Sequence, residues 1–149
     1  MVHKHLIYLI LISGFIFISS CNSQKKEKFN KITSYFETVH NYKLGNDINK
    51  IVVISEGKGC STCEKAFAEA ALAYLVDSTV FVVTAKGNNI NIQPFLQLEN
   101  NCFVDWQLNA KEYPEFVNSR VIYLKNNEID TTIIINSNEI MQQLEFIRK

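Results

Sequence analysis

The chain has 149 residues, and its 15 basic and 15 acidic side chains leave no formal net charge. With 47% hydrophobic residues, five glycines and two prolines, it is neither disordered nor collagen-like, and its length fits one compact domain. No basic excess is present to attract nucleic acid, so nucleic-acid binding is not expected. Four cysteines are too few for a disulfide-scaffolded mini-protein, which indicates a chemical role for Cys21, Cys60, Cys63 and Cys102.

Residues 1–20 predict an export signal. The uncharged apolar run Leu6–Phe17 follows Lys4 and is too short to cross a bilayer comfortably. It ends in Ile18-Ser19-Ser20-Cys21, which resembles the lipobox of bacterial lipoproteins. The resemblance implies cleavage before Cys21, a diacylglycerol on the Cys21 sulfur, and a lipid-anchored protein on the extracytoplasmic side of the bacterial cell envelope. The alternative is an ordinary secretory signal beside a cysteine, and both interpretations export the chain.

The mature chain is expected to hold a short tether and one domain. Residues 21–28 are polar and predict a flexible lipidated tether, followed by a domain over 29–149. At the start of that domain, apolar residues recur at helical spacing. They predict an amphipathic helix over 28–42 that packs on one side of a sheet, through Phe29, Ile32, Phe36 and Val39.

A strand–helix–strand unit follows. The β-branched run Ile51–Ile54 predicts a strand covered on both faces, and Thr79–Val83 predicts a second one. The helix between them is expected to begin within the cysteine motif, where Ser61 and Glu64 have capping-box spacing. This order predicts a parallel crossover. The apolar face of the helix would contain Cys63, Phe67, Ala70, Ala71, Tyr74 and Leu75.

The rest of the chain gives a weaker pattern and then a clear hairpin. Pro94 lies in a weak helical pattern, and residues 102–106 have the composition of a short extra strand. The paired Asn126 and Asn127 suit a tight turn between strands over 120–124 and 129–135. A final helix is expected after Asn136 as its cap, with Ile140, Leu144 and Ile147 on one face.

The sequence Cys60-Ser61-Thr62-Cys63 places two thiols within disulfide reach. A helix N-terminus favours the thiolate of Cys60, the species that attacks a disulfide, and the more buried Cys63 would then release the product. Lys58 would support the thiolate, whereas Glu64 would oppose it. A structural disulfide and half of a metal site are the alternatives. As further metal ligands, the mature chain offers only Cys102 and His40, with unmatched spacing.

The order of strand, CxxC motif, helix, strand, hairpin and terminal helix over 28–149 resembles the thioredoxin-like superfamily, specifically its extracytoplasmic lipoprotein members. The resemblance implies a three-layer α/β/α sandwich with a central mixed sheet of about four to five strands. It also implies that Cys60 is the nucleophile and Cys63 the resolving cysteine of a thiol-disulfide oxidoreductase. Its partners would be protein thiols or disulfides in the envelope, and no metal or organic cofactor would be needed.

Three positions differ from the family pattern. Gly59 stands where a tryptophan usually precedes the first cysteine, Ile54 where a buried aspartate is usual, and Ser119 where a cis-proline docks substrate. The alternative function is therefore a non-enzymatic adaptor with a static disulfide. We expect Cys102 to be a buried thiol outside the redox centre and His40 to be an ordinary surface or boundary residue. Aromatic residues such as Trp106 are expected in core or edge packing.

Overall fold

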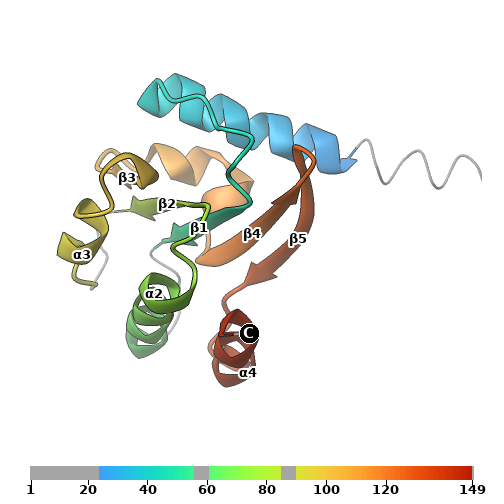
Figure 1. Cartoon of the computed structure of the whole chain (residues 1–149). Coiled ribbons are helices and arrows are strands. Elements are labelled where there is room, and N and C mark those ends of the chain that lie inside the picture. Colours follow the sequence, from blue (N-terminus) through green and yellow to red (C-terminus); the bar gives the residue numbers. More distant parts are fainter. Residues whose placement is uncertain (1–23, 56–60, 85–89, 149) are drawn as a thin grey trace, which may run out of the picture.

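The computed structural model describes residues 24–55, 61–84 and 90–148, and its centre is a mixed five-stranded sheet with helices on both sides (Figure 1). The strand order is β3-β2-β1-β4-β5. Neighbouring strands pair in parallel from β1 to β2 and from β2 to β3, whereas β4 is antiparallel to both β1 and β5. The strands are β1 (Lys50–Ile54), β2 (Thr79–Thr84), β3 (Cys102–Asp105), β4 (Arg120–Lys125) and β5 (Glu128–Ile134).

The two central parallel strands are built from β-branched and aromatic residues. Residues 51–54 of β1 and all six residues of β2 are buried, because helices cover both faces of the sheet. The helix α2 (Ser61–Tyr74) joins these two strands in the chain. The predicted parallel crossover and its two buried strands are confirmed.

A helix over 24–40 covers one face of the sheet and is the long helix at the top of Figure 1. Its Ile32 and Phe36 are fully buried against the sheet, as the apolar spacing predicted, whereas Phe29 and Val39 are only partly buried. Tyr35, which was not predicted to face the sheet, is fully buried as well. It also includes residues 24–28, which the sequence assigned to a flexible tether. Lys and Glu are good helix formers, and the Glu27–Lys31 ion pair of 2.9 Å has the i,i+4 spacing that supports a helix.

The opposite face is covered by α2, α3 (Gln93–Leu96) and α4 (Ile140–Ile147) (Figure 1). Phe67 of α2 and Phe95 of α3 are buried in the same apolar cluster as Phe81 of β2. The short 3-10 turns are η1 (Glu99–Asn101), η2 (Asn109–Glu112) and η3 (Pro114–Phe116). The region after β2, where the sequence pattern was weak, contains a short helix at Pro94 and the predicted extra strand, which is β3.

Two side-chain predictions on this face are wrong. Tyr74 was expected on the packed face of α2 but is 53% exposed, because its ring lies 5.7 Å from the guanidinium of Arg148 rather than against the sheet. Asn136 does not cap α4, which begins at Ile140 after Glu139. The Asn136 side chain instead accepts a hydrogen bond of 3.1 Å from the backbone N–H of Asn138, two residues on.

The β4–β5 hairpin forms at the predicted turn. Asn126 and Asn127 have φ angles of 53° and 59°, in the left-handed region that asparagine tolerates better than most residues. Across the hairpin, Arg120 faces Ile134 and Lys125 faces Glu128. The Asn126-Asn127 turn therefore allows β5 to pair with β4 as the last strand of the sheet.

Candidate functional site

The cysteine motif lies where β1 leads into α2. Cys63 is in the first turn of α2 and is partly buried, while Ser61 and Thr62 are exposed. Cys60, Lys58 and Gly59 lie outside the described residues. Because β1 and β2 run in parallel, α2 must return along the sheet, so its first turn lies beyond the end of the sheet at which β1 stops. We call this end of the sheet the carboxyl edge.

A pair of serines joins two strands at the carboxyl edge. The Ser119 hydroxyl accepts a hydrogen bond of 3.1 Å from the backbone N–H of Ser55 and lies 3.0 Å from the Ser55 carbonyl oxygen, to which it can donate. The Ser55 hydroxyl donates to the carbonyl of Val117 at 3.1 Å. Both serines are buried, with Ser119 5% exposed. This contact fixes the segment before β4 against the residue that follows β1.

Ser119 therefore uses its side chain inside the protein. No peptide bond in the described part of the chain is cis. The sequence placed Ser119 at the substrate-docking position of the thioredoxin-like pattern, and the structure brings it beside Ser55, five residues before Cys60. Nothing in the sequence pattern singles out Ser55, since one serine after a strand is not a distinctive signal.

A buried acid at the carboxyl edge, Asp105, lies on the face of the sheet opposite α2. Asp105, at the end of β3, is 1% exposed and accepts hydrogen bonds from the backbone N–H groups of Ala110, at 2.6 Å, and Gln107, at 3.2 Å. Side chains alternate along a strand, so Asp105 shares the face of Phe103, which packs beneath the 24–40 helix. On the α2 side, Ile54 is fully buried among apolar residues. The Asp105 carboxylate thus organises a loop on the opposite face from Cys63.

Cys102 is a thiol on the α2 side of β3. It forms no disulfide and packs against the apolar cluster beneath α2, but it is partly rather than completely buried, which corrects the expectation of a buried thiol. Burial raises the pKa of the Cys102 thiol to about 11. The thiol is therefore protonated at neutral pH and is a poor nucleophile.

His40 is a boundary residue, as expected. Its Nε2 lies 3.1 Å from the Tyr35 hydroxyl, and its ring centroid lies 4.9 Å from that of Phe103. Burial lowers the pKa of His40, and the charge of Asp105 opposes that shift. In residues 24–55, 61–84 and 90–148 we find no cluster of three or more His, Cys, Asp or Glu residues arranged to hold a metal ion.

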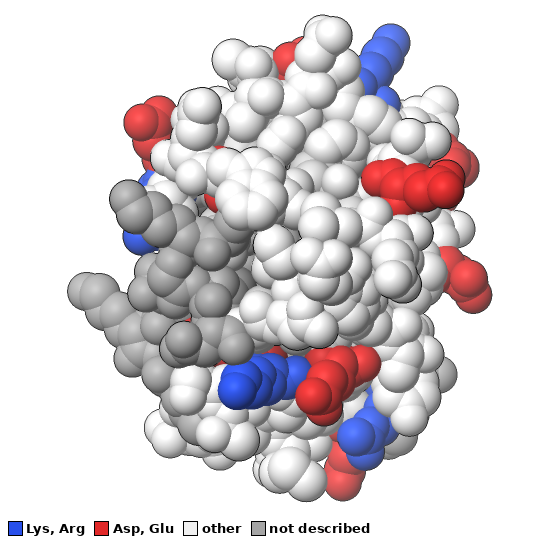
Figure 2. Space-filling view, turned by 90° about the vertical axis from the view of Figure 1, so that its left-hand side faces the viewer, with Lys and Arg blue, Asp and Glu red and all other residues white. Residues whose placement is uncertain are grey.

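Two apolar side chains are exposed near the carboxyl edge. Figure 2 views the side of the molecule at which β1 and β2 end, and part of the described surface on this side carries no charged side chain. Trp106, which follows β3, is 63% exposed, and Val117, whose carbonyl contacts Ser55, is 42% exposed. Trp106 is thus exposed where packing was expected. Exposed apolar residues of this kind are common where proteins contact other chains.

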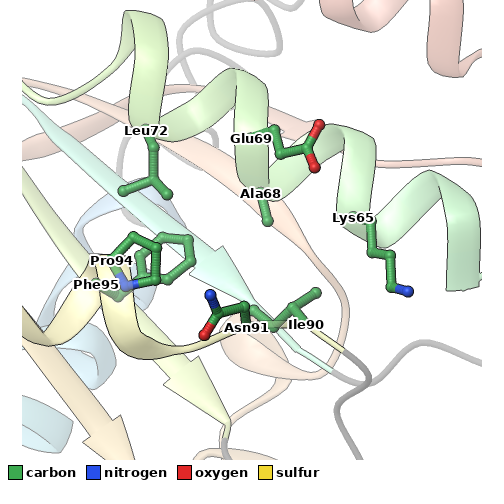
Figure 3. Close-up of a pocket in the computed structure, with 8 residues that line it drawn as sticks. All are labelled: Lys65, Ala68, Glu69, Leu72, Ile90, Asn91, Pro94 and Phe95. Atoms are coloured by element: carbon green, nitrogen blue, oxygen red, sulfur yellow. The ribbon is translucent and has the colours of Figure 1, made fainter.

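A pocket of about 380 Å³ lies between α2 and α3. Figure 3 shows Leu72 and Ala68 of α2 facing Pro94 and Asn91 across it, with Glu69 above and Lys65 at the right of the view. Lys65 is two residues after Cys63, so the pocket begins less than one helical turn from the cysteine motif. No sequence signal pointed to it, because its walls come from segments whose packing the sequence did not predict.

Comparison with family models, curated proteins and solved structures finds no match to this chain. The thioredoxin-like resemblance therefore stays a prediction from the residues. Cys21 and the whole predicted signal lie outside the described residues. Among the helices that the structure describes, none has the length and apolar character needed to cross a bilayer.

Proposed function

We propose that the protein is a lipid-anchored, thioredoxin-like oxidoreductase of the bacterial cell envelope that exchanges disulfides with protein substrates through Cys60 and Cys63. The observation that carries this proposal is the position of Cys63 in the first turn of α2, the helix that connects two parallel central strands. The mixed sheet, the late β4–β5 hairpin and the terminal α4 also support a thioredoxin-like arrangement.

The proposed reaction needs only the two motif thiols and a disulfide. The Cys60 thiolate attacks one sulfur of the substrate disulfide, forming a mixed disulfide and expelling the other substrate sulfur as a thiolate. Cys63 then loses its proton to solvent and attacks the Cys60 sulfur, which expels the second substrate thiolate. The protein ends as the Cys60–Cys63 disulfide, and two electrons have passed to the substrate. The same steps in reverse oxidise a dithiol.

The surroundings support exchange with protein substrates. The exposed Trp106 and Val117, near the carboxyl edge, suit contact with a polypeptide. The Ser119 hydroxyl is already bonded to Ser55, so it is a positioning group for the loop before β4 rather than a substrate ligand.

One observation favours the adaptor alternative. Ile54 is buried among apolar side chains at the position where the family pattern has a proton-accepting aspartate. Without an acid at that position, proton transfer from Cys63 depends on solvent. In the adaptor, Cys60 and Cys63 would remain as a static disulfide and the carboxyl edge would bind a partner without thiol chemistry.

A mixed-disulfide trap tests the oxidoreductase. In Cys63→Ser, the first exchange step is intact but the resolving thiol is missing, so we expect Cys60 to hold envelope proteins in adducts that a reductant releases. The adducts are detected by mass shift on non-reducing gels of membranes prepared without reductant, and mass spectrometry identifies the linked peptides.

The matched control is Cys60→Ser/Cys63→Ser, which retains Cys102 and lacks both motif thiols. It should capture at least tenfold less than Cys63→Ser, because the pKa of about 11 keeps Cys102 protonated. Equal capture by the two variants would reject the oxidoreductase and support the adaptor.

A further inference from the structure

A second pocket lies on the face of the sheet opposite α2, between the 24–40 helix, η3 and the β4–β5 hairpin. Its volume is about 240 Å³, below the usual range for drug-sized ligands. Its apolar walls include Pro114, Ile122 and Ile134, and Lys28 of the 24–40 helix also lines it. We call it the hairpin pocket. It shares no residue with the pocket beside Cys63.

A buried acid and a buried base line the hairpin pocket. Glu115 is 8% exposed and Arg120 is 9% exposed. The Oε2 atom of Glu115 is buried without a hydrogen-bond partner in the described part of the chain. Buried carboxylate oxygens are nearly always hydrogen-bonded, so this atom needs an explanation.

Arg120 does not supply the missing partner. In the part of the chain that the structure describes, no ion pair joins Arg120 to Glu115, and the Arg120 Nε donates instead to the Asn118 carbonyl at 3.1 Å. A guanidinium has five N–H donors, and this contact uses only one of them. Burial lowers the pKa of Arg120, and the charge of Glu115 opposes that shift. The pocket is thus lined by a carboxylate and a guanidinium that do not satisfy each other.

We propose that the hairpin pocket binds a small zwitterion, with an ammonium group on Glu115, a carboxylate on Arg120 and a short aliphatic side chain against the isoleucines. The ligand ammonium would donate a charge-assisted hydrogen bond to the Glu115 carboxylate, the ligand carboxylate would accept from Arg120 N–H groups other than the Nε–H, and the apolar walls would cover the rest of the ligand. An aliphatic amino acid has this chemistry. The ligand would be bound, not transformed, and the site does not depend on the thiol chemistry proposed above.

The test is isothermal titration calorimetry of the purified full chain with three ligands of nearly equal size. L-leucine carries both charged groups, 4-methylpentanoate lacks the ammonium, and 3-methylbutylamine lacks the carboxylate. We expect leucine to bind, and each half-ligand to bind at least about tenfold more weakly because one charged partner is lost. Cys60→Ser/Cys63→Ser should bind leucine as the unmodified chain does.

Two variants test which charged group of the ligand Glu115 and Arg120 each bind. In Glu115→Gln, the leucine affinity should fall about tenfold or more, while that of 4-methylpentanoate stays unchanged. In Arg120→Gln, leucine should weaken likewise and 3-methylbutylamine should not. The control is Glu112→Gln, an exposed glutamate of η2 outside the pocket, which should leave all three affinities unchanged.

No leucine binding at millimolar concentration would overturn the proposal. So would half-ligands that bind as tightly as leucine, since the missing charged group would then contribute nothing to binding. If a variant unfolds in a thermal melt, the three-ligand comparison on the unmodified chain still decides.

Discussion

Ser119 joins the residue after β1 to the segment before β4 through two hydrogen bonds to the backbone of Ser55. We predict that Ser119→Ala lowers the free energy of unfolding by about 1–3 kcal/mol, because a buried N–H and a buried carbonyl lose their partner. Urea denaturation measures the change. Ser137→Ala, at an exposed serine, should change the free energy of unfolding by less than about 0.5 kcal/mol. Equal effects would show that the serine contact contributes no stability.

Cys102 should react slowly with alkylating agents. With a pKa of about 11, only about one thiol in a thousand is ionised at pH 8, compared with about a quarter of ordinary thiols. In Cys60→Ser/Cys63→Ser, we expect iodoacetamide to modify Cys102 roughly a hundredfold more slowly than free cysteine at that pH. The rate should rise about tenfold per pH unit from pH 8 and level off above about pH 11. Mass spectrometry of the peptide that contains Cys102 measures it, and an ordinary rate at pH 8 would contradict the assignment.

At the scale of elements, the 24–40 helix is held by its aromatic residues. The Phe36 ring is fully buried and lies 5.3 Å, centroid to centroid, from that of Phe103. Phe36→Ala should therefore cost about 3–5 kcal/mol of stability, since it leaves a cavity between the helix and the sheet. The control is Phe146→Ala on α4, where the side chain is 57% exposed and the expected loss is about 1 kcal/mol or less. Thermal or urea unfolding compares the two, and similar losses would argue against this packing.

The elements that the sequence predicts well are those with one dominant local signal. The apolar runs of β1 and β2 strongly favour buried strands, and the paired Asn126 and Asn127 strongly favour a tight turn. Tyr74 and Asn136 were predicted wrongly because each has a competing partner: the Arg148 guanidinium for Tyr74, and the backbone N–H of Asn138 for Asn136. Such partners are chosen by packing and turn geometry that hydrophobic spacing does not encode.

The candidate site was predictable only in part, for a similar reason. Cys63 was identified because two cysteines at this spacing have a specific chemistry, and it does lie in the first turn of α2. The Ser55–Ser119 contact and the hairpin pocket join residues far apart in the chain. Their side chains come together only through the pairing of β4 with β1 and β5. No local sequence pattern therefore predicts the serine contact or the pocket.

For the molecule as a whole, we predict that lipid on Cys21 holds the protein to the membrane. Mass spectrometry of the purified membrane form should find an N-terminal Cys21 with a thioether-linked diacylglycerol. Cys21→Ser should lose this modification and leave the membrane fraction. An unmodified N-terminus, or a Cys21→Ser variant that stays equally membrane-bound, would contradict the lipoprotein assignment.

The proposed function requires Cys60 and Cys63 to form a redox couple, and measuring the reduction potential of this pair in the full chain tests that requirement. The protein is equilibrated with glutathione buffers of known potential, alkylated, and scored for the Cys60–Cys63 disulfide by mass spectrometry. We predict a two-electron transition between about −120 and −270 mV, the range of proteins that exchange disulfides. A potential below about −300 mV, typical of structural disulfides, or no disulfide between Cys60 and Cys63 in any buffer, would contradict it.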